Sequence, residues 1–231
     1  MSVRNSDGLI RLGVLALPLA ALLGLGGLYS GLKLGSGGII ASSDNQAVVS
    51  SGYFWSQFVG SALALTVLIF GVMALYAYLV NTGQKALALG ALVLTIAGIA
   101  VALTEVGLTE VGLYAYTVPA LSRSFLNGHP ESIRIVDYIF SGPFGSIDFL
   151  DFLPYSAGFI LFGIAIWRSG VLPRWAGVLV AVHAPLVSGL FSVVGSIVGV
   201  VLALVGGGWI ALSVLRSPAA RTQAEAEPRV R

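Results

Sequence analysis

Long runs of apolar residues alternate with short polar segments along almost the whole chain. A transmembrane helix needs about 17–25 predominantly apolar residues, because each residue adds about 1.5 Å and the hydrocarbon core is about 30 Å thick. Six runs are long enough, and we predict that each forms a transmembrane helix. These runs cover residues 12–34, 54–80, 86–104, 149–167, 174–190 and 193–215.

The polar segments between these runs predict connectors with no room for a soluble domain. Residues 35–52 form a Gly/Ser-rich loop, and residues 81–84 and 168–173 form tight turns. We therefore predict an all-α fold with a single six-helix transmembrane domain over residues 1–216. A disordered tail is predicted for residues 217–231, where Pro, Ala, Arg and Glu are mixed.

The longest connector, residues 105–147, is predicted to contain a short helix on the outer surface of the membrane. Pro130 suits the first position of a helix, and apolar residues then recur at helical spacing opposite Glu131 and Arg134. These apolar residues are Ile133, Val136 and Phe140. An amphipathic segment of this kind lies in the interface rather than across the bilayer.

Composition points to the same class of protein. Of the 231 residues, 57% are hydrophobic and 10% are charged, and the mean hydropathy is +0.94. Soluble domains carry about 25% charged residues, so a soluble enzyme is excluded. The basic residues are spread over loops and termini, which argues against nucleic acid as a partner. The predicted partner is the lipid bilayer, and the predicted location is the cell membrane.

The distribution of Lys and Arg predicts which side of the membrane each loop faces. With six helices and a cytoplasmic N-terminus, nine basic residues lie inside and three outside, as the positive-inside rule requires. The inside residues are Arg4, Arg11, Lys85, Arg168, Arg174, Arg216, Arg221, Arg229 and Arg231, and the outside residues are Lys33, Arg123 and Arg134. Counting residues 106–122 as a seventh helix gives five inside and seven outside, which breaks the rule. We therefore predict six helices with both termini in the cytoplasm.

His183 is the deepest ionisable residue of the predicted helices. It lies nine residues past the start of the fifth helix, or about 13 Å into the hydrocarbon core. Pro185 deprives the carbonyl of Ala181 of its helical donor, so an imidazole and a free backbone oxygen lie close together. His183 and Pro185 are therefore a candidate ligand site. The alternative is a neutral imidazole bonded to a neighbouring hydroxyl, for which the candidates are Thr66, Thr95 and Ser196.

Four acidic residues near the predicted outer surface form a second set of candidates. Glu105 and Glu110 would lie about 140° apart on one continuous helix, so they could not form a paired-carboxylate site there. Asp148 and Asp151 are three residues apart at the start of the fourth helix and share a face. They could bind a cation or transfer protons, but carboxylates also stabilise a helix N-terminus. For Glu105, the alternative to a functional role is that it marks the point where its helix meets water.

The sequence offers no catalytic or metal site that we can assign. It has no cysteine and two histidines, of which His129 lies in the long connector. Zinc binding and bis-imidazole haem ligation therefore lack ligands, and no lysine is deep enough for a retinal Schiff base. Motifs of membrane hydrolases and metalloproteases are missing as well. We expect no cofactor, and the sequence favours a non-enzymatic role over a novel enzyme.

Glycines at four-residue spacing predict close packing between helices. Small residues let two backbones approach, and this contact is a main source of association in membranes. The glycines concerned are Gly27, Gly31 and Gly35 in the first helix and Gly195 and Gly199 in the sixth.

The segment Gly163 to Gly177 reads Gly-Ile-Ala-Ile-Trp-Arg-Ser-Gly-Val-Leu-Pro-Arg-Trp-Ala-Gly. It resembles the inner hairpin of uncharacterised six-helix membrane proteins of bacteria and archaea, in which a helix ends in Arg-Ser and the next begins with Pro-Arg-Trp. The resemblance covers this hairpin and the six-helix layout, and it implies a membrane fold but no activity. The motif also has a physical basis, since Pro173 starts a helix and Trp167 and Trp175 suit the interface.

Two functions follow from these features. The first is non-enzymatic binding of a lipid, a small apolar ligand or a partner subunit in the helical bundle near His183. The alternative is a small cation- or proton-linked transporter or channel, because the acidic outer face would concentrate cations in a vestibule. The sequence does not decide between them.

Overall fold

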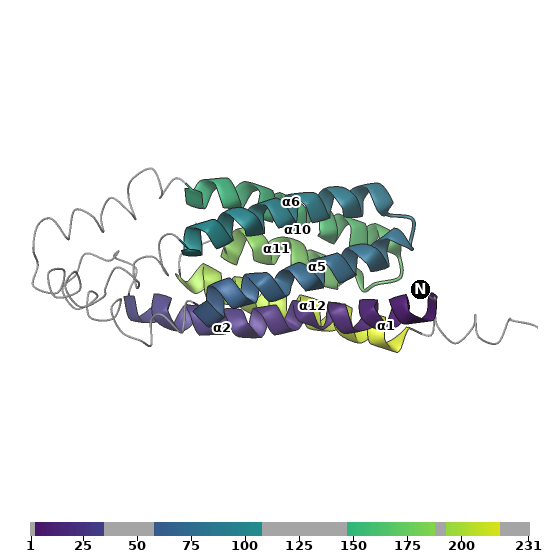
Figure 1. Cartoon of the computed structure of the whole chain (residues 1–231), viewed down its shortest axis with the longest axis horizontal. Coiled ribbons are helices and arrows are strands. Elements are labelled where there is room, and N and C mark those ends of the chain that lie inside the picture. The colour runs from purple at the N-terminus through teal and green to yellow at the C-terminus, as the bar shows by residue number, and fades with distance from the viewer. Residues whose placement is uncertain (1–2, 35–57, 108–146, 188–192, 218–231) are drawn as a thin grey trace, which may run out of the picture.

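The computed structural model describes residues 3–34, 58–107, 147–187 and 193–217. Within these ranges the chain is helical and has no strand, which confirms the predicted all-α class. The helices run along the long axis of an elongated bundle (Figure 1). They are α1 (Val3–Val14), α2 (Ala16–Leu34), the π-helical segment η1 (Phe58–Leu63), α5 (Ala64–Val80), α6 (Lys85–Glu105), α10 (Ile147–Ser169), α11 (Arg174–Val187) and α12 (Val193–Arg216).

Five helical segments in the described part of the chain are long and apolar enough to cross a membrane, judged by length and composition. The fifth predicted helix corresponds to α11, whose 14 described residues are fewer than such a span needs. Several predictions lie outside the described residues, so the structure does not bear on them. They are the loop 35–52, the start of the second helix at 54–57, the connector beyond residue 107 with its interfacial helix, the end of the fifth helix at 188–190, and the tail beyond residue 217.

Helical structure begins earlier than the predicted transmembrane run, which starts at residue 12. The helix begins at Val3 and is interrupted once, at Leu15, where the amide of Leu15 donates to the carbonyl of Leu12 at 3.1 Å. Pro18 explains the interruption, because it has no N–H to offer the carbonyl of Val14 four residues earlier. The prediction followed apolarity alone, whereas helical hydrogen bonding continues into the polar residues before the apolar run.

The helices form a closed ring in which each one packs against its successor in the chain. The contacts run α2 to α5, α5 to α6, α6 to α10, α10 to α11 and α11 to α12, and α12 returns to α2. The pair α6 and α10 makes the most extensive contact. Successive helices run in opposite directions (Figure 1). Because each described helix lies beside the next one in the chain, this up-and-down arrangement needs no connection that crosses the bundle from one side of the ring to the other.

One end of the bundle carries both short turns, residues 81–84 and 170–173, and we call it the turn end (Figure 1). Gly83 and Gly170 have positive φ angles of 81° and 69°, which glycine adopts without steric cost. Both turns were predicted and both are present, although the second begins at residue 170 rather than 168 because α10 continues to Ser169. The beginning of α1 and the end of α12 also lie here, and a guanidinium nitrogen of Arg11 donates to the carbonyl of Ser217 at 2.9 Å.

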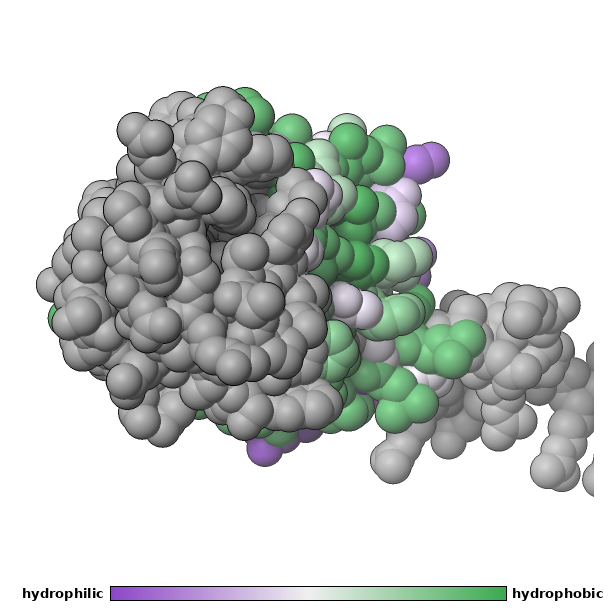
Figure 2. All heavy atoms as spheres, turned by 60° about the vertical axis from the view of Figure 1, so that its left-hand side comes forward, coloured by the Kyte–Doolittle hydropathy of each residue, from purple (hydrophilic) through white to green (hydrophobic). Residues whose placement is uncertain are grey.

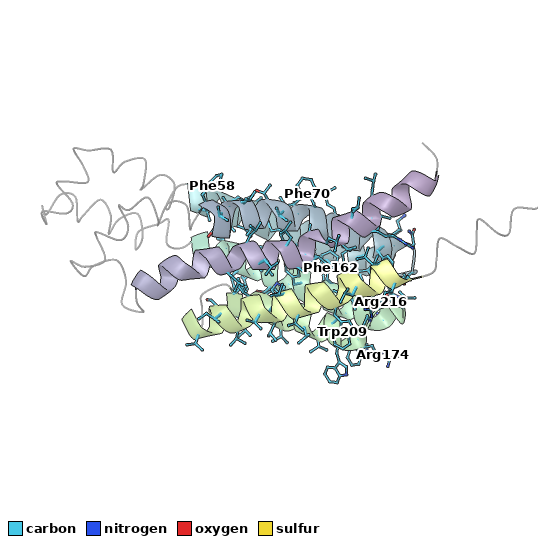
Figure 3. The ribbon with its side chains drawn as sticks, turned by 90° about the horizontal axis from the view of Figure 1, so that it is seen from below. Phe58, Phe70, Phe162, Arg174, Trp209 and Arg216 are labelled. Atoms are coloured by element: carbon cyan, nitrogen blue, oxygen red, sulfur yellow. The ribbon has the colours of Figure 1, made fainter. Side chains whose placement is uncertain are left out.

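Large apolar side chains fill the centre of the ring and also cover its outside. Phe162 is fully buried among the helices, whereas Phe70, Leu150 and Val194 are 61%, 62% and 69% exposed. Figure 3 shows Phe162 within the bundle and Phe70 at its edge. The visible side of the described helices is largely hydrophobic (Figure 2). The outer surface therefore suits an apolar surrounding better than water.

Glycines lie where neighbouring helices cross, and their missing side chains set the spacing. A Cβ on Gly98 of α6 would lie 2.6 Å from the backbone nitrogen of Tyr155 in α10. Gly163 and Gly177 face each other between α10 and α11 in the same way, at 2.6 Å from Cβ to carbonyl oxygen. The predicted role of Gly199 in close packing is confirmed, because its Cβ would lie 2.8 Å from the backbone nitrogen of Val187.

We predict that Gly98→Ala destabilises the bundle, because the new methyl group meets backbone atoms of α10 that cannot rotate away. Overpacking of this kind costs about 1–3 kcal/mol. Gly208→Ala in α12 is the matched control: no atom lies within 4 Å of its new Cβ, so helix propensity should leave it neutral or up to about 1 kcal/mol more stable. The measurement is reversible unfolding in mixed micelles, and equal stability of the two variants would refute the packing argument.

Candidate functional site

Three polar side chains are buried in the part of the chain that the structure describes. They are Thr95 in α6, Ser156 in α10 and His183 in α11, with exposures of 0%, 6% and 4%. Counted along their helices from the turn end, they lie about 13–20 Å deep, near the middle of the bundle. The three helices are consecutive members of the ring. We call these three residues the polar layer.

His183 is held on its own helix and against two aromatic rings of α10. Its Nδ1 donates to the carbonyl of Val180. Its ring meets Phe159 edge-on with centroids 4.5 Å apart, and Tyr155 with centroids 6.2 Å apart. A neutral imidazole that donates from Nδ1 keeps an acceptor lone pair on Nε2. The protein therefore presents one hydrogen-bond acceptor from the imidazole.

The hydroxyl groups of Thr95 and Ser156 are buried and have no hydrogen-bond partner among the described residues. Two other threonine hydroxyls in the bundle, one on α5 and one on α6, behave differently. Thr66 and Thr104 each donate to the carbonyl four residues earlier, at 2.8 and 2.9 Å. An unsatisfied buried hydroxyl costs about 1–3 kcal/mol, so two of them in one layer need an explanation.

Thr95 is held close to the backbone of α10. A Cβ on Gly158 would lie 2.3 Å from its Oγ1 and 2.6 Å from its backbone nitrogen. The glycine therefore allows α6 and α10 to approach at the level of the polar layer. Any larger residue at position 158 would push the threonine hydroxyl away from α10.

The hydrogen bond of His183 differs from the alternative predicted from the sequence, in which the imidazole is bonded to a neighbouring hydroxyl. The imidazole donates to backbone rather than to Thr66 or Thr95, since the Thr66 hydroxyl donates to the carbonyl of Ala62 and Thr95 has no partner among the described residues. The other predicted residue, Pro185, lies within α11, which stays helical through it.

Sequence reasoning named Thr95 only as a possible partner of the imidazole and overlooked Ser156. Thr95 lies ten residues from Lys85, which begins α6, and Ser156 lies thirteen residues from Ser169, which ends α10. Their distances from the helix ends place the hydroxyls of Thr95 and Ser156 as deep as His183, so depth along the helix also identifies these two residues from the sequence.

The predicted acidic residues lie at the end opposite the turn end, as far as the structure describes them. Glu105 is the last residue of α6, and Asp148 and Asp151 lie in the first turns of α10. The close contacts of Thr95 with Gly158 and of Gly98 with Tyr155 define the antiparallel register of the two helices. Extended by two turns, this register puts backbone positions 105 and 148 at one level. The side chains of all three, and all of Glu110, lie outside the described residues.

No group of three potential metal-ligating side chains occurs within the described ranges. The chain matches no protein-family model, and comparison with curated proteins and with solved structures finds no match either. The resemblance of the hairpin at residues 163–177 therefore stays a prediction. The polar layer is therefore the feature of this protein that bears on its function.

We predict that Thr95→Val stabilises the protein by about 1 kcal/mol when it is purified free of small molecules, because valine removes an unsatisfied hydroxyl and keeps the shape. Ser156→Ala should act in the same direction. Thr66→Val is the control, since its hydroxyl is already bonded to the carbonyl of Ala62 and its loss should be neutral or slightly destabilising. The measurement is unfolding in detergent, and destabilisation by Thr95→Val would show that this hydroxyl has a partner in the protein.

Proposed function

We propose that this chain is a multi-pass integral membrane protein of the cell membrane, with six transmembrane helices and both termini in the cytoplasm. The apolar exterior of the bundle supports the membrane location, because large hydrophobic side chains are exposed along its helices. In water, an apolar surface of this extent would drive aggregation. In a bilayer it is the surface that the lipid chains require.

The orientation is supported by the basic residues of the described helices. Lys85, Arg168, Arg174 and Arg216 begin or end their helices at the turn end, and Arg11 bonds to Ser217 there. Figure 3 shows Arg174 and Arg216 at this end and Phe58 at the other. By the positive-inside rule the turn end faces the cytoplasm, and α11 is counted with the five longer helices as a crossing.

We infer that the bundle binds a small, largely apolar molecule with one hydrogen-bonding group, such as a hydroxyl or a carbonyl. The observation that carries this inference is the polar layer, in which two buried hydroxyls lack a partner among the described residues and His183 offers an acceptor. The hydroxyls can donate or accept, whereas Nε2 can only accept while the imidazole is neutral. A lipid or another uncharged amphiphile meets these requirements, and a charged ligand would find no counter-ion in the layer.

The polar layer supports binding rather than catalysis. A nucleophilic hydroxyl needs a base within hydrogen-bonding reach, and that base needs a third group to orient it. In the described residues, His183 makes one hydrogen bond, to the carbonyl of Val180 on its own helix. Neither buried hydroxyl is bonded to the imidazole. The binding of a partner subunit through the apolar exterior is compatible with this function.

A small cation- or proton-linked transporter is the alternative. The observation in its favour is the register of α6 and α10, which brings positions 105 and 148 to one level at the predicted outer end. Carboxylates there would form an acidic vestibule above the polar layer. Against it, His183 is the only ionisable side chain deep in the described helices.

The proposed topology can be tested with single cysteines, because the natural chain has none. Cysteines introduced at Thr82 and Ser169, in or beside the two turns, should react with an impermeant maleimide only after the membrane is opened. A cysteine at Ser132, in the predicted outer connector, is the control and should react in intact cells. Labelling of positions 82 and 169 from outside would refute the orientation.

Ligand binding can be tested by native mass spectrometry of the protein released gently from its own membrane. We expect a discrete small-molecule adduct on the wild type whose occupancy falls about fivefold in Thr95→Val, because one hydrogen bond is worth about 1 kcal/mol. His183→Leu should lose the adduct as well, whereas the control Thr66→Val should keep it.

Three results would overturn this proposal. A clean apo mass for the wild type would remove the ligand, and an unchanged adduct in both layer variants would place it elsewhere. Flux of protons or monovalent cations above empty liposomes, abolished by Asp148→Asn, would replace binding with transport.

A further inference from the structure

A groove of about 240 Å³ opens on the outside of the bundle between α10 and α11. Its lining is entirely apolar and comprises Ile160, Gly163, Ile164, Trp167, Gly177, Val178 and Ala181. The two glycines create it, because their backbones touch and no side chain fills the space beside the contact. From Trp167 to Ile160 the groove runs about 10 Å along α10 toward the middle of the bundle.

Two arginines lie near the end of this groove that is nearest the turn end. Arg168 and Arg174 are both exposed, and the guanidinium of Arg174 lies 5.7 Å from the centre of the Trp167 ring, which lines the groove. Trp167 in turn meets Trp175 edge-on at 6.2 Å. The aromatic contact therefore holds one arginine directly beside the mouth of the groove.

The N-terminus of α11 adds a third favourable feature for an anion. The helix begins at Arg174, directly after Pro173. The amides of Ala176 and Gly177 donate to the carbonyl of Pro173 at 3.0 and 3.4 Å, so the amides at the very start of the helix are those of Arg174 and Trp175. The helix dipole places partial positive charge at this end. A phosphate beside Arg174 would meet these two amides and the Arg174 guanidinium, and Arg168 lies in the last turn of α10 on the other side of the short turn.

We propose that the hairpin of α10 and α11 binds one anionic phospholipid, with its phosphate at Arg168 and Arg174 and one acyl chain in the groove. The proposal rests on the membrane location proposed above, and it is independent of the polar layer. A hydrophobic channel that begins at two arginines and continues toward the bilayer centre matches the order of headgroup and chain in a lipid. The positive-inside orientation puts the site in the cytoplasmic leaflet, where anionic lipids attract basic residues.

The test is native mass spectrometry of delipidated protein in detergent, titrated with phosphatidylglycerol or with phosphatidylcholine of the same chains. We expect one tight phosphatidylglycerol adduct, weakened about fivefold by Arg168→Gln and again by Arg174→Gln. Arg216→Gln is the matched control, because this arginine is also exposed at the turn end but lies on α12. It should leave the affinity unchanged.

The groove itself is tested by filling it. Val178→Phe should reduce the binding of both lipids, while Val201→Phe, at an exposed position of α12 outside the groove, should not. Unfolding in detergent checks that all variants are folded, and Thr95→Val should retain the adduct, which separates this site from the polar layer.

The proposal is overturned if the two lipids bind equally, if Arg216→Gln weakens binding as much as the hairpin variants, or if filling the groove has no effect. A dimer mass that Val178→Phe abolishes would instead assign the groove to a second copy of the chain. Failure of the proposed membrane location is recognised separately. It would change the cysteine labelling pattern, whereas the effect of the arginine variants on lipid binding is measured in detergent and does not depend on that pattern.

Discussion

Direct contact between helix backbones at glycines is the constraint on which this structure depends. The outside of the bundle exposes many large apolar side chains. In the proposed bilayer location, burial of apolar surface would give the helices little reason to associate. Close packing has to supply the attraction, and it requires the helices to touch. Gly98 and Gly158 provide this between α6 and α10, Gly163 and Gly177 between α10 and α11, and Gly199 between α11 and α12.

These contacts also determine where chemistry can occur. The close approach of α6 and α10 at Gly158 brings the Thr95 hydroxyl into a dry interface, and the next interface carries His183 against Phe159. The contact between Gly163 and Gly177 acts on the outer surface instead of in the interior, and it leaves an open groove with arginines near one end. The buried polar layer and the exposed groove are therefore two products of one packing scheme.

The proposed ligand would explain why an apolar bundle keeps the three hydrogen-bonding side chains of the polar layer at its centre. A hydroxyl without a partner lowers stability, and valine or alanine would fit the same space. A bound molecule that satisfies these groups would offset their cost, and the uncharged surroundings select a neutral ligand. The groove differs in each respect, since it lies at the surface, begins at two cationic side chains and suits a charged headgroup.

The sequence by itself determined the helical class, both short turns and the approximate ends of α6 and α10, because apolar run length and residue spacing fix these along a single helix. It missed the early start at Val3 and the break caused by Pro18, which depend on backbone hydrogen bonds rather than on apolarity. Only the tertiary structure decided which helices are neighbours, that Ser156 joins Thr95 and His183 in one layer, and that the groove lies beside Arg174. These depend on the rotation and register of one helix against another, which steric contact at particular glycines sets.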